Sequence, residues 1–371
     1  MDFLWPKPSK IAIPVSKPTI SSQDVERVTK ALWAEELSKG AAQEEFERSF
    51  GEYHGRDVLT VSNGSVAIML ALRALGIGLG DEVVVPALSY AATASSVVNV
   101  GAIPKFCDVD LDDWNLSPAH LEAAITPRTK AIIAVHNYGY CVDVKKIREL
   151  ATFYNLPVIE DTAEGLGGFF EGQPLGTFFE VATWSFYGNK VITSGEGGAV
   201  SSPIVDIFEK MKLLRGQGMD PSRQFYFTEP GYNFRLSNVS SALLGSQFAR
   251  FSEINDRRRK IFEYYKSSLQ DVGIFQIARA DSTPAPWLFS LRFNAKEKTK
   301  RIAKKLADLG IETRPIFYPL PAMPAFSKFS SGDYDNSSQI SNSGISLPTY
   351  ESLKSNEIEL ICESILEESK K

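Results

Sequence analysis

The sequence predicts an α/β fold, with a mostly parallel central sheet, helices on both of its faces and a smaller C-terminal α+β domain. Short apolar runs alternate with longer amphipathic runs between residues 57 and 160. The short runs are apolar throughout, as in Val83-Val84-Val85, which is typical of parallel strands that are buried on both faces. After residue 237 the pattern changes to long helical stretches, which indicates a second unit.

The first 20 residues are rich in proline and lysine and predict an extended arm. Ser21 and Ser22 cap a helix that starts at residue 23, and Pro118 opens another helix after Ser117. The predicted strands are 57–61, 82–85, 103–109, 130–135, 156–160 and 181–184, with another starting at 199, and the predicted helices between them are 41–53, 65–75, 91–100 and 143–154.

The C-terminal third has a different pattern. Its helical stretches are 237–267 (one helix or two), 296–309 and 355–371, its strands are 287–293 and 311–314, and its loops are 315–324 and 327–346. We therefore expect an N-terminal arm (1–20), a large cofactor-binding α/β domain (21–250) and a small C-terminal α+β domain (251–371).

Composition excludes several classes of protein. The net charge of −5 counts against a general nucleic-acid or membrane-surface binder. No stretch has the long uncharged apolar run of a signal peptide or a spanning helix. The three cysteines are far apart and there are only three histidines, so we expect neither a disulfide framework nor a metal site. These features predict a cytoplasmic protein.

One lysine lies in a glycine-rich loop between two predicted strands. The loop begins Ser185-Phe186-Tyr187-Gly188-Asn189-Lys190 and continues to Gly195-Glu196-Gly197-Gly198, and its glycines allow the backbone to approach a ligand closely. A lysine in a dry pocket loses its proton more readily and becomes a nucleophile toward carbonyl compounds. A lone loop lysine is usually only a solvated side chain, so this prediction depends on the rest of the chain.

Three more signals fall where predicted strands end. Gly64-Ser65 opens a helix, whose first backbone N–H groups favour a phosphate. Tyr90 follows one strand, where it can stack on a flat ring. Asp161 ends another strand, where its carboxylate can hold a protonated pyridine nitrogen, and Glu164 lies one turn further on.

Each of these signals alone is more often a helix cap, a core tyrosine or a carboxylate at the start of a helix. Their order along the chain favours the interpretation that they bind a cofactor. A phosphate cradle, a stacking aromatic, an acid at a strand end and then a lysine are the parts that a pyridoxal 5'-phosphate enzyme needs.

A set of motifs belongs together with these residues. They are Ser62-Asn63-Gly64-Ser65, Gly80-Asp81-Glu82-Val83, Val135-His136, Glu160-Asp161, Ser185-Phe186-Tyr187-Gly188-Asn189-Lys190, Gly195-Glu196-Gly197-Gly198, Gly231-Tyr232-Asn233-Phe234-Arg235 and Glu312-Thr313-Arg314-Pro315. On these motifs almost the whole chain resembles the DegT/DnrJ/EryC1/StrS family of nucleotide-sugar aminotransferases, which have the fold-type I architecture of pyridoxal phosphate enzymes.

The resemblance implies roles around the cofactor ring. Lys190 would form the internal aldimine and later move protons between the substrate carbon and the cofactor. Asp161 would pair with the pyridine nitrogen. Tyr90 would stack on the ring, and Glu164 would lie near its hydroxyl group.

The resemblance also implies how the phosphate and the substrate are bound. Gly64, Ser65 and Ser185 would hold the phosphate. Asn233 in such enzymes reaches the phosphate of the neighbouring subunit, which implies a homodimer with two shared active sites. The residues that would face the sugar nucleotide are Arg314, Tyr318 and His136.

The substrate is less closely specified than the cofactor. Glu164, Gly216-Gln217-Gly218 and Phe317-Tyr318-Pro319 favour a subgroup that transfers an amino group from glutamate to C4 of a GDP-linked 4-keto-6-deoxyhexose. Two departures from the family pattern fall where sugar contacts are expected. Asn137 and Tyr140 stand where relatives often have leucine and histidine, and Pro321 stands where they often have histidine.

These departures leave alternatives open. The same chemistry on a dTDP- or UDP-linked 3- or 4-keto sugar, or on an 8-keto octulosonate, fits the cofactor residues equally well. A sugar dehydratase of the same family usually carries histidine in place of Lys190, which counts against it here. A cofactor-binding sensor would not need both Lys190 and Asp161.

Overall fold

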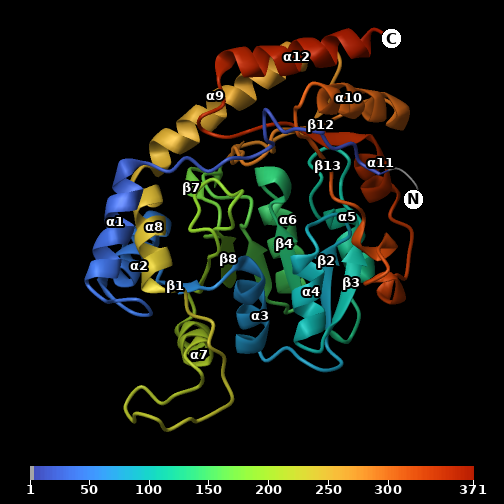
Figure 1. Cartoon of the computed structure of the whole chain (residues 1–371). Coiled ribbons are helices and arrows are strands. Elements are labelled where there is room, and N and C mark those ends of the chain that lie inside the picture. Colours follow the sequence, from blue (N-terminus) through green and yellow to red (C-terminus); the bar gives the residue numbers. More distant parts are fainter. Residues whose placement is uncertain (1–3) are drawn as a thin grey trace.

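A seven-stranded sheet forms the centre of the computed structural model, which describes residues 4–371 (Figure 1). The strands lie side by side in the order β1 (Val58–Val61), β9 (Gly198–Ser201), β8 (Val181–Ser185), β5 (Val158–Asp161), β4 (Thr129–Val135), β2 (Glu82–Pro86) and β3 (Ile103–Cys107). β9 is antiparallel to both of its neighbours, β1 and β8, and the other adjacent pairs are parallel. The predicted α/β class with a mostly parallel sheet is confirmed.

Alternate residues of the same strand pack in two different hydrophobic cores, one on each face of the sheet. Val83 and Val85 of β2 pack with helices on one face of the sheet, while Val84 packs with helices on the other. This explains the unbroken apolar runs in the sequence, because both faces are covered. The helices on the first face are α3 (Gly64–Ala74), α4 (Ala92–Asn99) and α7 (Val205–Arg215), and those on the second are α5 (Pro118–Ala124) and α6 (Val144–Phe153).

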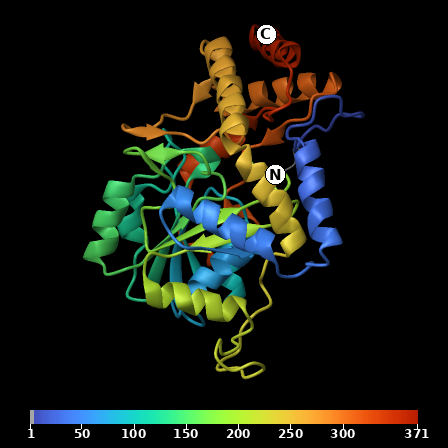
Figure 2. The same ribbon diagram turned by 90° about the vertical axis from the view of Figure 1, so that its left-hand side faces the viewer.

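Three helices pack together beside the β1 edge of the sheet. They are α1 (Ser22–Trp33), α2 (Ala41–His54) and α8 (Asn238–Ala249), and both views show them side by side (Figures 1 and 2). Ser21 caps α1, as predicted, by accepting a hydrogen bond from the backbone N–H of Asp24 at 3.2 Å. The predicted long helix after residue 237 is two helices, which meet at Arg250.

The C-terminal part builds a second sheet of four antiparallel strands. Their order is β10 (Ile274–Phe275), β12 (Ser290–Arg292), β14 (Gly344–Ser346) and β13 (Arg314–Pro315). The helices α9 (Phe251–Leu269), α10 (Lys296–Asp308) and α12 (Ser355–Ser369) contribute to the core beneath it. A small three-stranded sheet of β11 (Ser282–Thr283), β6 (Phe169–Phe170) and β7 (Gln173–Pro174) lies apart from both.

The predicted loop at 327–346 is wrong, because this segment forms α11 (Asp335–Ser343) and then β14 inside the second sheet. The segment lacks the apolar pattern of a buried element, because several of its buried residues are serines that are hydrogen-bonded. The hydroxyl of Ser337 donates to Asp108, and Ser346 exchanges a hydrogen bond with Ser290 at 2.8 Å. Hydrogen-bonded serines can occupy a core that a hydropathy pattern assigns to solvent.

The N-terminal arm is extended over the residues that the structure describes. Residues 4–20 contain no helix, and the arm touches the C-terminal part through a bridge between Ile13 and Ile311. The backbone N–H of Val15 donates to Glu312 at 2.9 Å. Residues 1–3 of the predicted arm lie outside the described residues, and the division at residue 250 stays a prediction.

The segment after α7 projects away from the body of the molecule in both views (Figures 1 and 2). It carries the exposed aromatic residues Phe225, Tyr226 and Phe227. Its two ends are joined by a bridge between Gly216 and Asn233. Within residues 4–371, none of the helices has both the length and the apolar character required to cross a membrane.

Candidate active site

Lys190 lies in the loop that connects β8 to β9. The loop is tied across its base, where the backbone N–H of Phe186 donates to Gly197 at 2.8 Å and that of Ser194 donates to Phe186 at 3.2 Å. Phe186 and Ile192 are fully buried. The loop is therefore a fixed part of the fold, and it presents the Lys190 side chain, which is 13% exposed, at the carboxyl end of β8.

The amine of Lys190 has two close neighbours. Its Nζ lies 3.7 Å from Oε1 of Glu164 and 4.0 Å from the centre of the Trp287 ring. Burial lowers the pKa of Lys190, and the carboxylates of Glu164 and Asp161 oppose this shift. A lysine with a lowered pKa more readily supplies the neutral amine that attacks carbonyl compounds.

Asp161 is the last residue of β5 and its carboxylate lines the same cavity. Oδ2 accepts a hydrogen bond from the Thr93 hydroxyl at 3.3 Å, and Oδ1 accepts one from the backbone N–H of Ala163 at 3.1 Å. Burial raises the pKa of Asp161, against the effect of these hydrogen bonds and of Lys190. Such a buried carboxylate would be stabilised by a cationic ligand.

Glu164 lies between Lys190 and the backbone of Tyr138. Its Oε2 accepts a hydrogen bond from the Tyr138 N–H at 2.7 Å. Burial raises the pKa of Glu164 to about 7, although Lys190 favours the ionised form. Glu164 therefore titrates close to neutral pH, beside the amine.

The start of α3 lies against the end of β8. The side chain of Asn63 caps this helix by accepting a hydrogen bond from Val66 N–H at 3.0 Å, and the first N–H groups of the helix face the cavity without an intrahelical acceptor. A Cβ added to Gly64 would lie 2.9 Å from the Cβ of Ser185. Only glycine permits this approach, which brings Ser185 next to a helix start of the kind that favours anions.

One cavity of about 650 Å³ joins these groups. The sequence-predicted residues that line it are Gly64, Ser65, Tyr90, Asp161, Glu164, Ser185, Lys190 and Arg314. Three others do not line it: His136, Tyr318 and Asn233. The geometry thus gathers the predicted cofactor residues of one chain, with Arg314 contributed by the C-terminal sheet.

His136 does not reach the cavity, which corrects its predicted role in substrate binding. The ring is fully buried, and Nε2 lies 2.9 Å from Oε1 of Glu160. Nδ1 accepts a hydrogen bond from the backbone N–H of Val142 at 3.2 Å. Both ring nitrogens are occupied within the fold, so His136 has a structural role.

Tyr318 and Asn233 lie outside the cavity for different reasons. Tyr318 is 41% exposed and follows Phe317, which does line the cavity. Asn233 is exposed at the base of the projecting segment. This position is compatible with contact to a second subunit, and that contact remains a prediction.

The departures from the family pattern also lie outside the cavity lining. Asn137 is fully buried, and its amide donates to the carbonyls of Leu88 and Trp114 at 2.7 and 2.9 Å. Pro321 is buried as well. None of these residues lines the cavity, and whether they change the substrate stays a prediction.

Sequence reasoning missed several residues that line the cavity. They are Thr93, Tyr138, Trp287 and Phe317. Tyr138 has a left-handed backbone with φ of 55°, which is uncommon outside glycine. No pattern in the sequence predicts this conformation. Trp287 lies 97 residues after Lys190 in the sequence, so no local pattern connects them.

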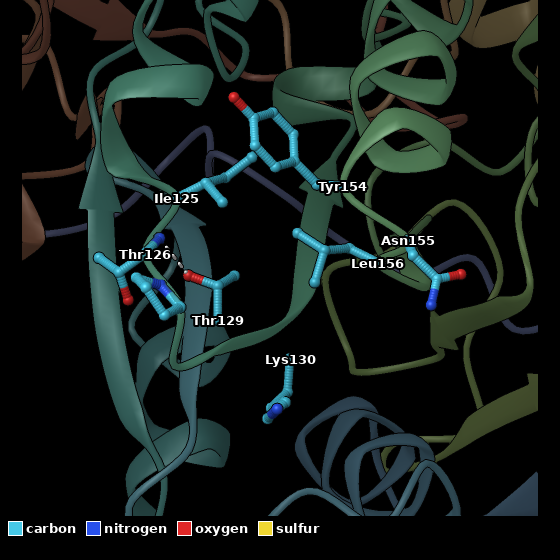
Figure 3. A pocket seen from close by; sticks show the side chains of 8 residues that line it. Ile125, Thr126, Thr129, Lys130, Tyr154, Asn155 and Leu156 are labelled. Atoms are coloured by element: carbon cyan, nitrogen blue, oxygen red, sulfur yellow. Dashed lines mark hydrogen bonds between the residues drawn. The ribbon is translucent and has the colours of Figure 1, made fainter.

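A second hollow, of about 490 Å³, lies at the opposite end of the strands (Figure 3). It is formed where β4 begins, by residues 125–127 and 129–130, and just before β5, by residues 154–156. Ligands of parallel sheets bind at the carboxyl ends of strands, and none of the predicted site residues lines this hollow. We therefore place the active site at the Lys190 cavity.

The chain is similar to known proteins along nearly its whole length. The model of the DegT/DnrJ/EryC1/StrS aminotransferase family matches residues 18–366. The chain belongs to this family. A GDP-perosamine synthase from Escherichia coli O157:H7 is 38% identical over 357 residues, which cover 96% of this chain and 98% of the relative. Another from Caulobacter vibrioides is 40% identical over 323 residues, which cover 85% and 87% of the two chains.

A solved structure shows the same fold. The aminotransferase TlmJ from Streptoalloteichus hindustanus superposes with a TM-score of 0.91 and 27% identity, and the match covers 96% of this chain and 98% of that one. Family and fold agree with the resemblance seen in the sequence. This member of the DegT/DnrJ/EryC1/StrS family is a pyridoxal phosphate-dependent aminotransferase of fold-type I.

The residues present fit pyridoxal phosphate. The contact between Gly64 and Ser185 provides a cradle for the phosphate, and the buried carboxylate of Asp161 matches a protonated ring nitrogen. Lys190 is in the same cavity. Tyr90 is 62% exposed, at a position where it can cover one side of a flat ligand.

Proposed function

We propose that this aminotransferase transfers the amino group of glutamate to C4 of a GDP-linked 4-keto-6-deoxyhexose. The main support for aminotransferase chemistry is that Lys190, Asp161 and the start of α3 line the same cavity. The identity of the sugar rests on the two relatives named GDP-perosamine synthase, which this chain matches over most of its length.

The cofactor-binding residues divide into two groups. The N–H groups of Gly64 and Ser65, with the Ser185 hydroxyl, would hold the phosphate. Asp161 would accept a hydrogen bond from the protonated ring nitrogen, and the hydrogen bond from Thr93 orients its carboxylate. When bound, pyridoxal phosphate supplies an aldehyde that lysine can attack and a ring that accepts electrons from the substrate carbon.

Lys190 and Glu164 handle protons in this proposal. The Lys190 amine would hold the cofactor and would carry a proton to or from the substrate carbon. The carboxylate of Glu164 accepts a hydrogen bond from the Tyr138 N–H at 2.7 Å, and its Oε1 lies 3.7 Å from Nζ of Lys190. Its carboxyl group can therefore accept or return a proton near neutral pH.

The substrate would approach from the side of the C-terminal part of the chain. Arg314 lines the cavity and offers a guanidinium group to a negatively charged nucleotide. Tyr318 is exposed and follows Phe317, which lines the cavity. Asn233 would complete the phosphate site of a second subunit, which makes the active unit a homodimer with two shared sites.

The test is a comparison of sugar donors. Enzyme loaded with pyridoxal phosphate is incubated with glutamate and either GDP-4-keto-6-deoxymannose or the dTDP- and UDP-linked 4-keto-6-deoxyglucose, and the products are read by mass spectrometry. We expect kcat/KM for the GDP sugar to exceed that for the others by at least about tenfold, with 2-oxoglutarate formed in equal amount. Lys190→Ala serves as the inactive control.

Two results would overturn this assignment. A preference for a dTDP- or UDP-linked sugar would keep the aminotransferase and change its substrate. A product that has lost a hydroxyl group without gaining nitrogen would identify a dehydratase.

A further inference from the structure

Trp287 contacts the candidate lysine from the C-terminal part of the chain. The Lys190 Nζ lies 4.0 Å from the centre of its ring, and its indole Nε1 donates to the carbonyl of Asn189 at 3.0 Å. Asn189 is the residue directly before Lys190. Trp287 therefore touches both ends of the lysine, at the backbone and at the amine.

Trp287 is itself held rigidly. It is 3% exposed, and the guanidinium group of Arg258 on α9 donates to the carbonyls of Pro286, at 2.8 Å, and of Trp287. Arg259 donates to the carbonyl of Pro284 at 3.0 Å. Two neighbouring arginines of α9 thus fix the segment that presents the indole.

A second anchor joins this segment to the large sheet. The backbone N–H of Ala285 donates to the carbonyl of Gly139 at 2.9 Å, just after β4. A Cβ at Gly139 would lie 2.2 Å from the Ala285 carbonyl oxygen, and φ there is 86°, so only glycine permits this junction. The position of the indole is set by both parts of the molecule.

We propose that Trp287 is a positioning residue for Lys190, holding the lysine backbone through its indole N–H and directing the amine with its ring face. The inference rests on the proposed role of Lys190. It assigns two separable tasks. The N–H fixes where the loop places the lysine, and the ring face stabilises the amine in its charged form through a cation–π contact.

Other charged groups face the same amine and are unchanged by substitutions at Trp287. Glu164 and Asp161 favour the ammonium form, and Arg314 disfavours it. Glu196, on the same loop as Lys190, also lines the cavity. A difference between wild type and Trp287 variants therefore reports the indole rather than the surrounding charges.

Two variants separate the two tasks. Trp287→Phe keeps a ring face and removes the N–H donor, while Trp287→Leu removes both. Trp184→Phe is the matched control, because Trp184 is 1% exposed, does not line the cavity, and leaves its indole nitrogen without a hydrogen-bond partner within the described residues.

The first readout uses the apoenzyme. Acetic anhydride is applied across a pH series, and mass spectrometry measures the acetylated fraction at Lys190. We expect the labelling midpoint to fall by about half to one pH unit in Trp287→Leu, since the ring face no longer stabilises the ammonium form. Trp287→Phe and Trp184→Phe keep it within about 0.3 pH units.

The second readout is the glutamate half-reaction of the loaded enzyme, followed by cofactor absorbance. We expect it to slow about tenfold in Trp287→Phe and about a hundredfold in Trp287→Leu, because small displacements of a reacting group cost this much. Trp184→Phe stays within about twofold of wild type. Thermal unfolding of each variant shows whether lost stability explains the change.

The proposal is overturned if the labelling midpoint in Trp287→Leu stays at the wild-type value or rises, or if both Trp287 variants react as fast as Trp184→Phe. The labelling arm does not depend on any cofactor. It can therefore support or refute the role of Trp287 even if Lys190 proves not to be the attachment point.

Discussion

Lys190 and Glu164 form a buried pair in which each group shifts the pKa of the other. Burial lowers the pKa of the amine and raises the pKa of the carboxyl group to about 7, while each group favours the charge of the other. With 3.7 Å between the two atoms, a small change in the cavity can move the proton. This is the property expected of groups that exchange protons with a substrate.

The raised pKa of Glu164 gives a prediction about stability. The folded apoenzyme keeps this proton at pH values where the unfolded carboxyl group, with a pKa of 4.5, has lost it. Between about pH 4.5 and 7 the wild type should therefore lose stability relative to Glu164→Gln as pH rises, by at most about 3.4 kcal/mol.

Urea unfolding of the two apoenzymes across this pH range provides the measurement. The exposed Glu149 supplies a control in Glu149→Gln, which should follow the wild type. A difference between Glu164→Gln and wild type that does not change between pH 5 and 7 would contradict the account.

Site residues that directly follow a strand could be predicted from the sequence. Cavity residues that come from distant parts of the chain, such as Trp287, could not. Asp161 could be found because it ends β5, and the preceding residue faces the other side of the sheet. Glu160 pairs there with His136. The error at His136 arose because a polar residue at a strand end looks the same whether it meets a ligand or a neighbouring strand.

The helix α3 and the strand β8 show how two elements make one site. The first turn of α3 approaches Ser185 so closely that a Cβ at Gly64 would lie 2.9 Å from its Cβ and 3.2 Å from its Oγ. We expect Gly64→Ala to displace the helix start and raise the Kd of pyridoxal phosphate at least about tenfold, a change of about 1.4 kcal/mol. A fluorescence titration of the apoenzyme measures it, and an unchanged Kd would refute the cradle.

Gly245→Ala is the control for Gly64→Ala, because Gly245 lies in α8, which does not line the cavity. A Cβ there would have no neighbour closer than 3.8 Å. Because glycine weakens a helix interior, Gly245→Ala should stabilise the protein by about 0.5–1 kcal/mol, as measured by urea unfolding, without changing cofactor affinity. Destabilisation would show that the helix environment is tighter than the structure indicates.

Elements with a clear apolar pattern were predictable, and β14 was not. It contains Ile345, fully buried, between a glycine and a serine. Its place in the sheet depends on hydrogen bonds such as that from Arg292 to Ser343, at 2.9 Å, beside it. Partners of this kind lie about 50 residues away in sequence, where no local pattern can reveal them.

At the scale of the whole molecule, the cavity is built by both parts of the chain. The seven-stranded sheet supplies Asp161, and the C-terminal part supplies Trp287 and Arg314. The projecting segment with Asn233 at its base extends away from this body (Figure 2). A second subunit that received this segment would share its site with the first, as we propose.

Shared sites predict complementation. Lys190→Ala and Asn233→Ala chains, co-expressed with different tags and purified as the mixed dimer, contain one site with an intact Lys190 and an intact Asn233. This dimer should have about half of the wild-type activity per dimer, well above the mean of the two parent variants. Activity equal to that mean would show that Asn233 acts within its own subunit.

The most direct test of the account is reduction of the loaded enzyme with sodium borohydride, followed by digestion and mass spectrometry. We expect a phosphopyridoxyl group on the peptide that contains Lys190, and none in Lys190→Ala. A label on any other lysine, or no label in enzyme that binds the cofactor, would contradict the assignment on which the proposed function rests.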